Sequence, residues 1–155
     1  MEPEQFVYVS YIRTTPEKLW NALLKPEFTR EYWFGSWQAS AWERGSPWRL
    51  IAPGGRTTDA GEVLEIDPPR RLVLAWRNEF NEAARAEGVT HATFELEQDG
   101  DIVKLTVTHA TPVRGLMLEG VSKGWPHILS SLKTLLETGH ALPGTDRWPW
   151  SDGGE

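Results

Sequence analysis

His109 is the titratable side chain that the sequence most clearly directs toward the protein interior. It closes the run 102–109, in which Val103, Leu105 and Val107 alternate with polar residues, so a strand places these side chains on one face. There the imidazole could hydrogen-bond the polar group of a ligand or act as a base near neutral pH. It could also be a structural histidine that is bonded to the backbone or to a nearby carboxylate. The sequence leaves these alternatives open.

Other catalytic and metal-binding patterns are missing from the sequence. There is no cysteine, which excludes disulfides, thiol nucleophiles and zinc–thiolate sites. The histidines His91, His109, His127 and His140 lack metal-ligand spacing, and no serine lies in a G-x-S-x-G motif. The glycine-rich segment 53–56 lacks the lysine and the helix of a phosphate-binding loop and indicates a hairpin turn. We therefore predict no catalytic residue, no metal and no cofactor.

Tryptophan is the unusual feature of the composition, with nine in 155 residues. Each brings a large apolar body and one N–H that needs a hydrogen-bond partner. A packed core can hold several, but this number suggests that some line a cavity, a groove or an interface. An aromatic-rich core without a ligand is the alternative.

Length and charge narrow the possible classes of protein. A chain of 155 residues is the size of one domain. The net charge is −6 without a basic cluster, which argues against nucleic acid as a partner. No apolar run reaches the length of a membrane span. The start, Met-Glu-Pro-Glu, lacks the features of a signal peptide, so we expect a cytoplasmic protein.

A long amphipathic helix is predicted near the end of the chain, within residues 115–142. Gly139 is placed to cap its end, and Pro143 follows. Pro126 lies inside the pattern, which predicts either a helix that starts near Ser122 or a kink between residues 120 and 126 that would open a cavity mouth. Apolar residues recur at steps of three and four and form one stripe: Leu118, Val121, Trp125, Ile128, Leu129, Leu132, Leu135 and Leu136.

The rest of the chain is mostly strands. Residues 6–13 read as a strand, Thr15 and Pro16 begin a short helix, and Pro26 begins another over residues 26–32. Six further strands are indicated by apolar alternation and turn residues, over 37–42, 48–52, 57–66, 72–77, 92–97 and 102–109. The alternation is typical of an antiparallel sheet with one solvated face, so we predict an α+β fold.

The long helix must bury its stripe against the concave face of this sheet, an arrangement that tends to leave an internal cavity. Residues 79–90 form the longest polar segment between two predicted strands, either a lid from which Phe80 reaches the cavity or a short solvated helix.

We divide the chain into a domain over 1–142 and a tail over 143–155. The glycine and proline content of the tail predicts disorder. Trp148 and Trp150 instead favour docking on the body or on a partner chain.

Five segments, in this order, resemble the SRPBCC (START-like) superfamily over about residues 6–139. The central segment is similar to the branch named after the activator of the heat-shock-protein-90 ATPase. The segments are Thr15–Leu23 with Pro26-Glu27, Tyr32-Trp33-Phe34, Gly61–Trp76, Leu105–His109 and Gly124–Lys133.

The resemblance implies a helix-grip fold, in which a seven-stranded antiparallel sheet wraps the C-terminal helix and two short helices follow the first strand. It implies a ligand-binding module more often than an enzyme, because members of the superfamily hold lipids, sterols, polyketides or plant hormones and only some are cyclases. True chaperone activators carry an additional N-terminal domain, which we do not expect here.

We therefore predict non-enzymatic binding of a small hydrophobic or amphipathic molecule between the sheet and the long helix. His109 and the Tyr32 hydroxyl are the polar groups expected to orient it. The alternatives are a protein-interaction or co-chaperone-like module, with a homodimer as one form and Trp42, Trp148 and Trp150 on its surface, or a cyclase- or hydrolase-type enzyme. The predicted lining is Tyr32, Trp33, Phe34, Trp37, Trp48, Leu50, Trp76, Phe94, His109, Trp125, Ile128 and Leu132.

Overall fold

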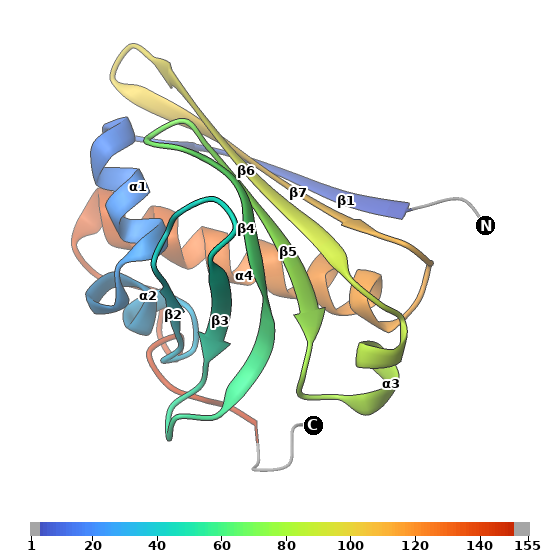
Figure 1. Ribbon diagram of the computed structural model, residues 1–155. Helices are drawn as coiled ribbons and strands as arrows, with labels where there is room; N and C mark the ends of the chain where they lie inside the picture. The colour runs from blue at the N-terminus through green and yellow to red at the C-terminus, as the bar shows by residue number, and fades with distance from the viewer. Residues whose placement is uncertain (1–3, 151–155) are drawn as a thin grey trace.

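The computed structural model describes residues 4–150 and shows a curved sheet that holds a long helix (Figure 1). This confirms the predicted α+β helix-grip fold. In chain order the elements are β1 (Glu4–Ile12), α1 (Pro16–Leu24), α2 (Pro26–Tyr32), β2 (Trp37–Ser40), β3 (Pro47–Ile51), β4 (Thr57–Asp67), β5 (Arg71–Asn78), α3 (Glu82–Ala86), β6 (Thr90–Asp99), β7 (Ile102–Thr111) and α4 (Leu116–Thr138).

The sheet has seven strands in the order β1-β7-β6-β5-β4-β3-β2, and every neighbouring pair is antiparallel. Strands β2 to β7 follow one another as neighbours, whereas β1 crosses to the far edge beside β7. Helices α1 and α2 connect the two edges, β1 and β2. The sheet therefore forms a concave surface, across which α4 lies (Figure 1).

Local sequence signals explain most of these elements. Thr15 Oγ1 accepts the backbone N–H of Lys18 at 3.2 Å and caps α1, as predicted. In β7 the side chains of Val103, Leu105 and Val107 are fully buried, and the residues between them are half-buried. The alternation thus places His109 on the inner face, where it is also fully buried.

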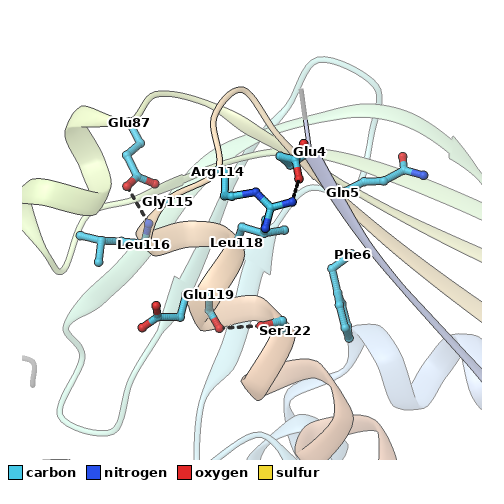
Figure 2. A pocket seen from close by; sticks show the side chains of 10 residues that line it. All are labelled: Glu4, Gln5, Phe6, Glu87, Arg114, Gly115, Leu116, Leu118, Glu119 and Ser122. Carbon is cyan, nitrogen blue, oxygen red and sulfur yellow. Dashed lines mark hydrogen bonds and ion pairs between the residues drawn. The ribbon is translucent and has the colours of Figure 1, made fainter. Parts of the chain in front are cut away.

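Helix α4 begins earlier than its own sequence indicates. The Glu87 carboxylate accepts the backbone N–H groups of Leu116 and Met117 at 2.7 and 3.0 Å, and Figure 2 shows it against this first turn. A side chain from a distant loop therefore satisfies the free amides of the helix start and places a negative charge at the positive end of the helix dipole. Of the two predicted alternatives, a helix start near Ser122 is therefore wrong, because α4 runs from Leu116 and has Pro126 in its interior. The predicted end is confirmed, because Gly139 adopts a φ of 87°.

The connection between β5 and β6 contains α3, a helix of five residues. Asn81 Oδ1 accepts the N–H of Ala84 at 3.0 Å and caps the start of α3.

No helix in the part of the chain that the structure describes is long and apolar enough to cross a membrane.

The segment after α4 lies against the body as far as residue 150, so the predicted disorder is wrong for residues 143–150. Its anchor is Thr145, which is fully buried and whose hydroxyl contacts Ser131 Oγ at 2.8 Å and the Glu31 carbonyl at 3.0 Å. In Figure 1 this segment, drawn in red, runs beside α2 and past the lower ends of β2 and β3. Residues 151–155, the rest of the predicted tail, lie outside the described residues.

Candidate functional site

Aromatic rings fill the space between the concave face of the sheet and α4. Trp76 lies at their centre, with ring centroids 4.4 Å from Trp48, 5.7 Å from Trp125 and 6.2 Å from Trp33. Phe94 adds an edge contact to Trp125 at 5.6 Å. We call these five residues the aromatic cluster. None of them is more than 6% exposed, although they come from four elements and the loop after α2.

His109 connects the helix to the sheet through a chain of hydrogen bonds beside this cluster. Its Nδ1 accepts the indole N–H of Trp125 at 3.1 Å. This bond assigns the proton to Nε2, which then donates to Thr90 Oγ1 at 2.8 Å. The Thr90 hydroxyl in turn donates to the Trp76 carbonyl at 2.7 Å. Both ring nitrogens of His109 are therefore used inside the fold.

Burial, together with a smaller contribution from the nearby His91, lowers the pKa of His109 to about 3. The imidazole is consequently neutral at any physiological pH. A neutral ring with both nitrogens bonded has no free lone pair with which to take a proton from a substrate. Of the readings that the sequence left open, the geometry favours the structural histidine, although its partners are Thr90 and Trp125 rather than a carboxylate.

Asp59 is a buried acid that the sequence reasoning missed. Its Oδ2 accepts the indole N–H of Trp76 at 2.7 Å, and its side chain lies on the concave face of β4. Burial raises the pKa of Asp59 to about 6, and the charge of Glu79 adds to the shift. Alternation within residues 57–66 could have revealed it, since Asp59 shares a strand face with Gly61 and Val63.

Gly61 lies on β4 between the strands that carry Trp48 and Trp76. It is the register partner of both, on β3 and on β5. A Cβ at this position would overlap the Ala75 carbonyl oxygen, so the closeness of β4 to β5 requires glycine.

The other predicted polar group, the Tyr32 hydroxyl, is also bonded internally. It donates to the Ala22 carbonyl at 2.8 Å, and burial raises its pKa. Trp48 donates its indole N–H to Gln38 Oε1 at 2.9 Å, and the Gln38 amide donates to the Leu23 carbonyl at 2.6 Å. Among residues 4–150, Thr29 Oγ1 is the single fully buried side-chain polar atom without a hydrogen-bond partner. The interior is thus almost completely satisfied.

The remaining predicted lining residues divide into three groups. Leu50, Ile128 and Leu132 belong to the buried core around the aromatic cluster. Phe34 is at its edge and packs on His127, with ring centroids 5.2 Å apart. Trp37 is the exception, because Gln38 is the inward residue of β2 and Trp37 therefore faces outward, under the Arg30 guanidinium at 4.5 Å.

An open groove of about 710 Å³ lies outside this interior, between the start of β1 and the first turns of α4 (Figure 2). Glu4 pairs with Arg114 at 2.5 Å, and Glu87 caps the helix, so the main charges of the groove are already paired. A smaller pocket of about 250 Å³ lies along residues 140–147 and Glu31. Neither is lined by the aromatic cluster.

Known structures share this architecture. CalU16 of Micromonospora echinospora has a TM-score of 0.70 at 21% identity, over 87% of this chain and 77% of that chain. The Aha1 dimer of Colwellia psychrerythraea has a TM-score of 0.70 at 20% identity, over 88% and 98%. An HSP90 activator of Plasmodium falciparum has a TM-score of 0.69 at 23% identity, over 86% and 96%. Similarity at these identities shows a common fold alone.

No curated protein matches the chain. The model of one protein family, described as "Activator of Hsp90 ATPase homolog 1-like protein", matches residues 13–137. That span includes the three short helices α1 to α3, the six strands β2 to β7 and nearly all of α4. Because this match covers most of the chain and the architecture agrees with it, the protein belongs to the family of activator of Hsp90 ATPase homolog 1-like proteins, within the SRPBCC superfamily.

Proposed function

We propose that this protein binds a small hydrophobic or amphipathic molecule between the sheet and α4, without converting it chemically. The observation that carries the proposal is the aromatic cluster, which gathers five large rings from separate elements on the concave face. Such walls provide affinity through apolar burial, at roughly 25 cal/mol for each Å² removed from water. The proposed wall is the predicted lining without Trp37.

Binding requires the rings to separate, because they are in mutual contact in the described state. The ligand then replaces ring–ring contacts with its own apolar surface. Asp59 is the polar group best suited to orient it, since its carboxylate is buried and can accept a hydrogen bond from a hydroxyl or an amine. Tyr32 and His109 remain in the wall, and each would have to exchange an internal hydrogen bond in order to contact the ligand.

The interior chemistry favours binding over catalysis. An enzyme would need titratable groups that converge on one reacting atom. Asp59 accepts the indole N–H of Trp76 and His109 accepts that of Trp125, so each group is bonded within the fold rather than directed at a shared reacting atom.

Native mass spectrometry of the purified protein tests the proposal, together with solvent extraction of what co-purifies. We expect a discrete added mass on the wild type, its loss in Trp125→Leu, and its retention in Trp42→Leu, which changes a tryptophan outside the cluster. A bare mass for all three proteins, with nothing in the extract and no added mass after incubation with a fatty-acid and sterol mixture, would contradict it.

A second candidate is a protein-interaction module that forms a homodimer. The favouring observation is a row of exposed apolar side chains on the outer face of the edge strand β1, namely Val7 (47% exposed), Val9 (42%) and Tyr11 (50%). The similar protein from Colwellia is described as a dimer. Light scattering after size exclusion should give twice the monomer mass for the wild type and for Val89→Lys, but the monomer mass for Val9→Lys.

The family description also suggests a chaperone ATPase as a partner. The test is whether this protein stimulates a purified HSP90-type ATPase. Stimulation that is lost in Val9→Lys would favour a co-chaperone-like role over the binding of a small molecule. We place either function in the cytoplasm, which cell fractionation would test.

A further inference from the structure

Four aromatic rings meet at one end of the interior, where the chain turns from α2 into β2 and from β5 into α3. Phe34 contacts Trp150 with centroids 5.0 Å apart, and Phe80 contacts Trp148 at 5.8 Å. The two tryptophans contact each other at 4.7 Å. We call Phe34 and Phe80 the mouth, and residues 146–150 the strap.

The mouth is continuous with the aromatic cluster. Phe34 belongs to the same buried core cluster as Trp33, which stacks on Trp76. Phe80 lies two residues after Asn78, the register partner of Asp59, and the Asn78 side chain accepts the backbone N–H of Phe80 at 2.9 Å. A group that replaced the strap would therefore contact Phe34, which belongs to the same core cluster as the rings, at the end of the sheet where Asn78 pairs with Asp59.

The body holds the mouth in place without help from the strap. The Arg56 guanidinium lies over the Phe80 ring, 4.4 Å from its centroid. Phe34 is kept at a φ of 54°, a left-handed conformation that is strained for a phenylalanine, and its ring packs edge-on against His127. A strained aromatic residue at the rim of an aromatic interior indicates a functional constraint.

The strap is held much more weakly than the segment before it. Thr145 and Ser131 form a buried hydrogen-bonded anchor, but within the described residues the hydrogen bonds of the tail end there, apart from a contact between Arg147 and Asp146 inside the strap. The strap meets the mouth through ring edges, with Trp148 half-buried against the core and Trp150 42% exposed. It can leave without breaking the anchor.

We infer that the mouth is a binding site for a planar aromatic group, which the protein's own Trp148 and Trp150 occupy until a ligand displaces them. This rests on the proposed function, because it names the opening and the ligand class of the same interior site. The indoles act as built-in competitors. Their tether gives them a high effective concentration, so they weaken the apparent affinity of any free aromatic ligand.

The nine indole N–H groups provide the readout, since each gives one nitrogen–proton correlation in an NMR spectrum. The probes are 4-ethylphenol and its saturated counterpart 4-ethylcyclohexanol, titrated into the wild type, Trp148→Ala/Trp150→Ala and Trp42→Ala. We expect 4-ethylphenol to shift the Trp33, Trp76 and Trp125 signals, with an affinity at least about threefold higher in the double variant than in the other two proteins. The saturated probe should bind more weakly in all three.

A peptide in trans provides the matched control. Acetyl-Asp-Arg-Trp-Pro-Trp-amide, the sequence of the strap, should shift the backbone amides of Phe34 and Phe80 in the double variant and restore the lower wild-type affinity for 4-ethylphenol. Equal affinity for 4-ethylphenol in the double variant and the wild type would overturn the inference and leave the proposed function intact. Peptide binding at the mouth without any probe shift at Trp76 or Trp125 in any variant would overturn the proposed function and, with it, the role of the strap as a competitor.

Discussion

Trp125 of α4 donates its indole N–H to Nδ1 of His109 on β7 at 3.1 Å, and this bond fixes both the position of the helix over the sheet and the tautomer of the imidazole. Since burial lowers the pKa of His109 to about 3, the ring should not titrate between pH 5 and 8. Imidazole nitrogen NMR should show a constant Nε2–H tautomer across this range. A titration of His109 near pH 6.5 would contradict the assigned geometry.

Removing the donor of this bond should destabilise the protein. Trp125→Phe keeps much of the aromatic packing but leaves Nδ1 of His109 buried without a partner. We expect a loss of about 1–3 kcal/mol in the free energy of unfolding, measured by urea denaturation. Trp42→Phe, at a half-buried position outside the cluster, should lose much less. Equal losses would show that ring volume, rather than the hydrogen bond, accounts for the effect.

Asp59 should make stability depend on pH in a defined direction. Because burial raises its pKa from 3.8 to about 6, the native state binds more protons than the unfolded state between these values, and stability falls as pH rises through this range. Asp59→Asn keeps an acceptor for Trp76 and removes the charge. The variant should match the wild type near pH 4 and exceed it by on the order of 3 kcal/mol at pH 8. His109 is present in both proteins, so its contribution cancels in the difference, and a difference independent of pH would refute the assignment.

Glu87 should act on the start of α4 from outside the helix. Glu87→Ala removes the acceptor for the amides of Leu116 and Met117 and a negative charge from the helix N-terminus. We expect a loss of about 1 kcal/mol and faster hydrogen exchange at these two amides. Glu97→Ala, which changes an exposed carboxylate on β6, is the control and should alter neither quantity.

Local periodicity predicted an antiparallel sheet and one long helix because each strand and helix carries its own inward face, and the family resemblance implied the helix-grip arrangement. The alternation of residues 102–109 was sufficient to place His109, and the stripe from Leu118 to Leu136 was sufficient to require a concave sheet. The start of α4 was beyond this reasoning, because its cap comes from Glu87, far away in the chain. Trp37 was misplaced because β2 has four residues and too few alternations to set a face.

The candidate site was harder to predict, for a physical reason. Periodicity reports which side of an element faces inward, but it does not report whether facing side chains leave a space between them. The five residues of the aromatic cluster lie in the interior, yet their mutual contacts depend on how closely α4 approaches the sheet and on Gly61 within β4. Asp59 was missed because a carboxylate normally indicates a solvated face, and here an indole N–H offsets part of the desolvation.

The contact between Trp48 and Trp76 also gives the molecule an optical property. Two indoles whose centroids are 4.4 Å apart and whose planes are tilted by 43° do not absorb light independently, since their transition dipoles couple. The pair should therefore produce a circular dichroism couplet that originates from tertiary packing rather than from the backbone. The protein thus contains its own chromophore for the state of its interior, and any event that moves one ring away from the other will change the sign pattern or the intensity of that band.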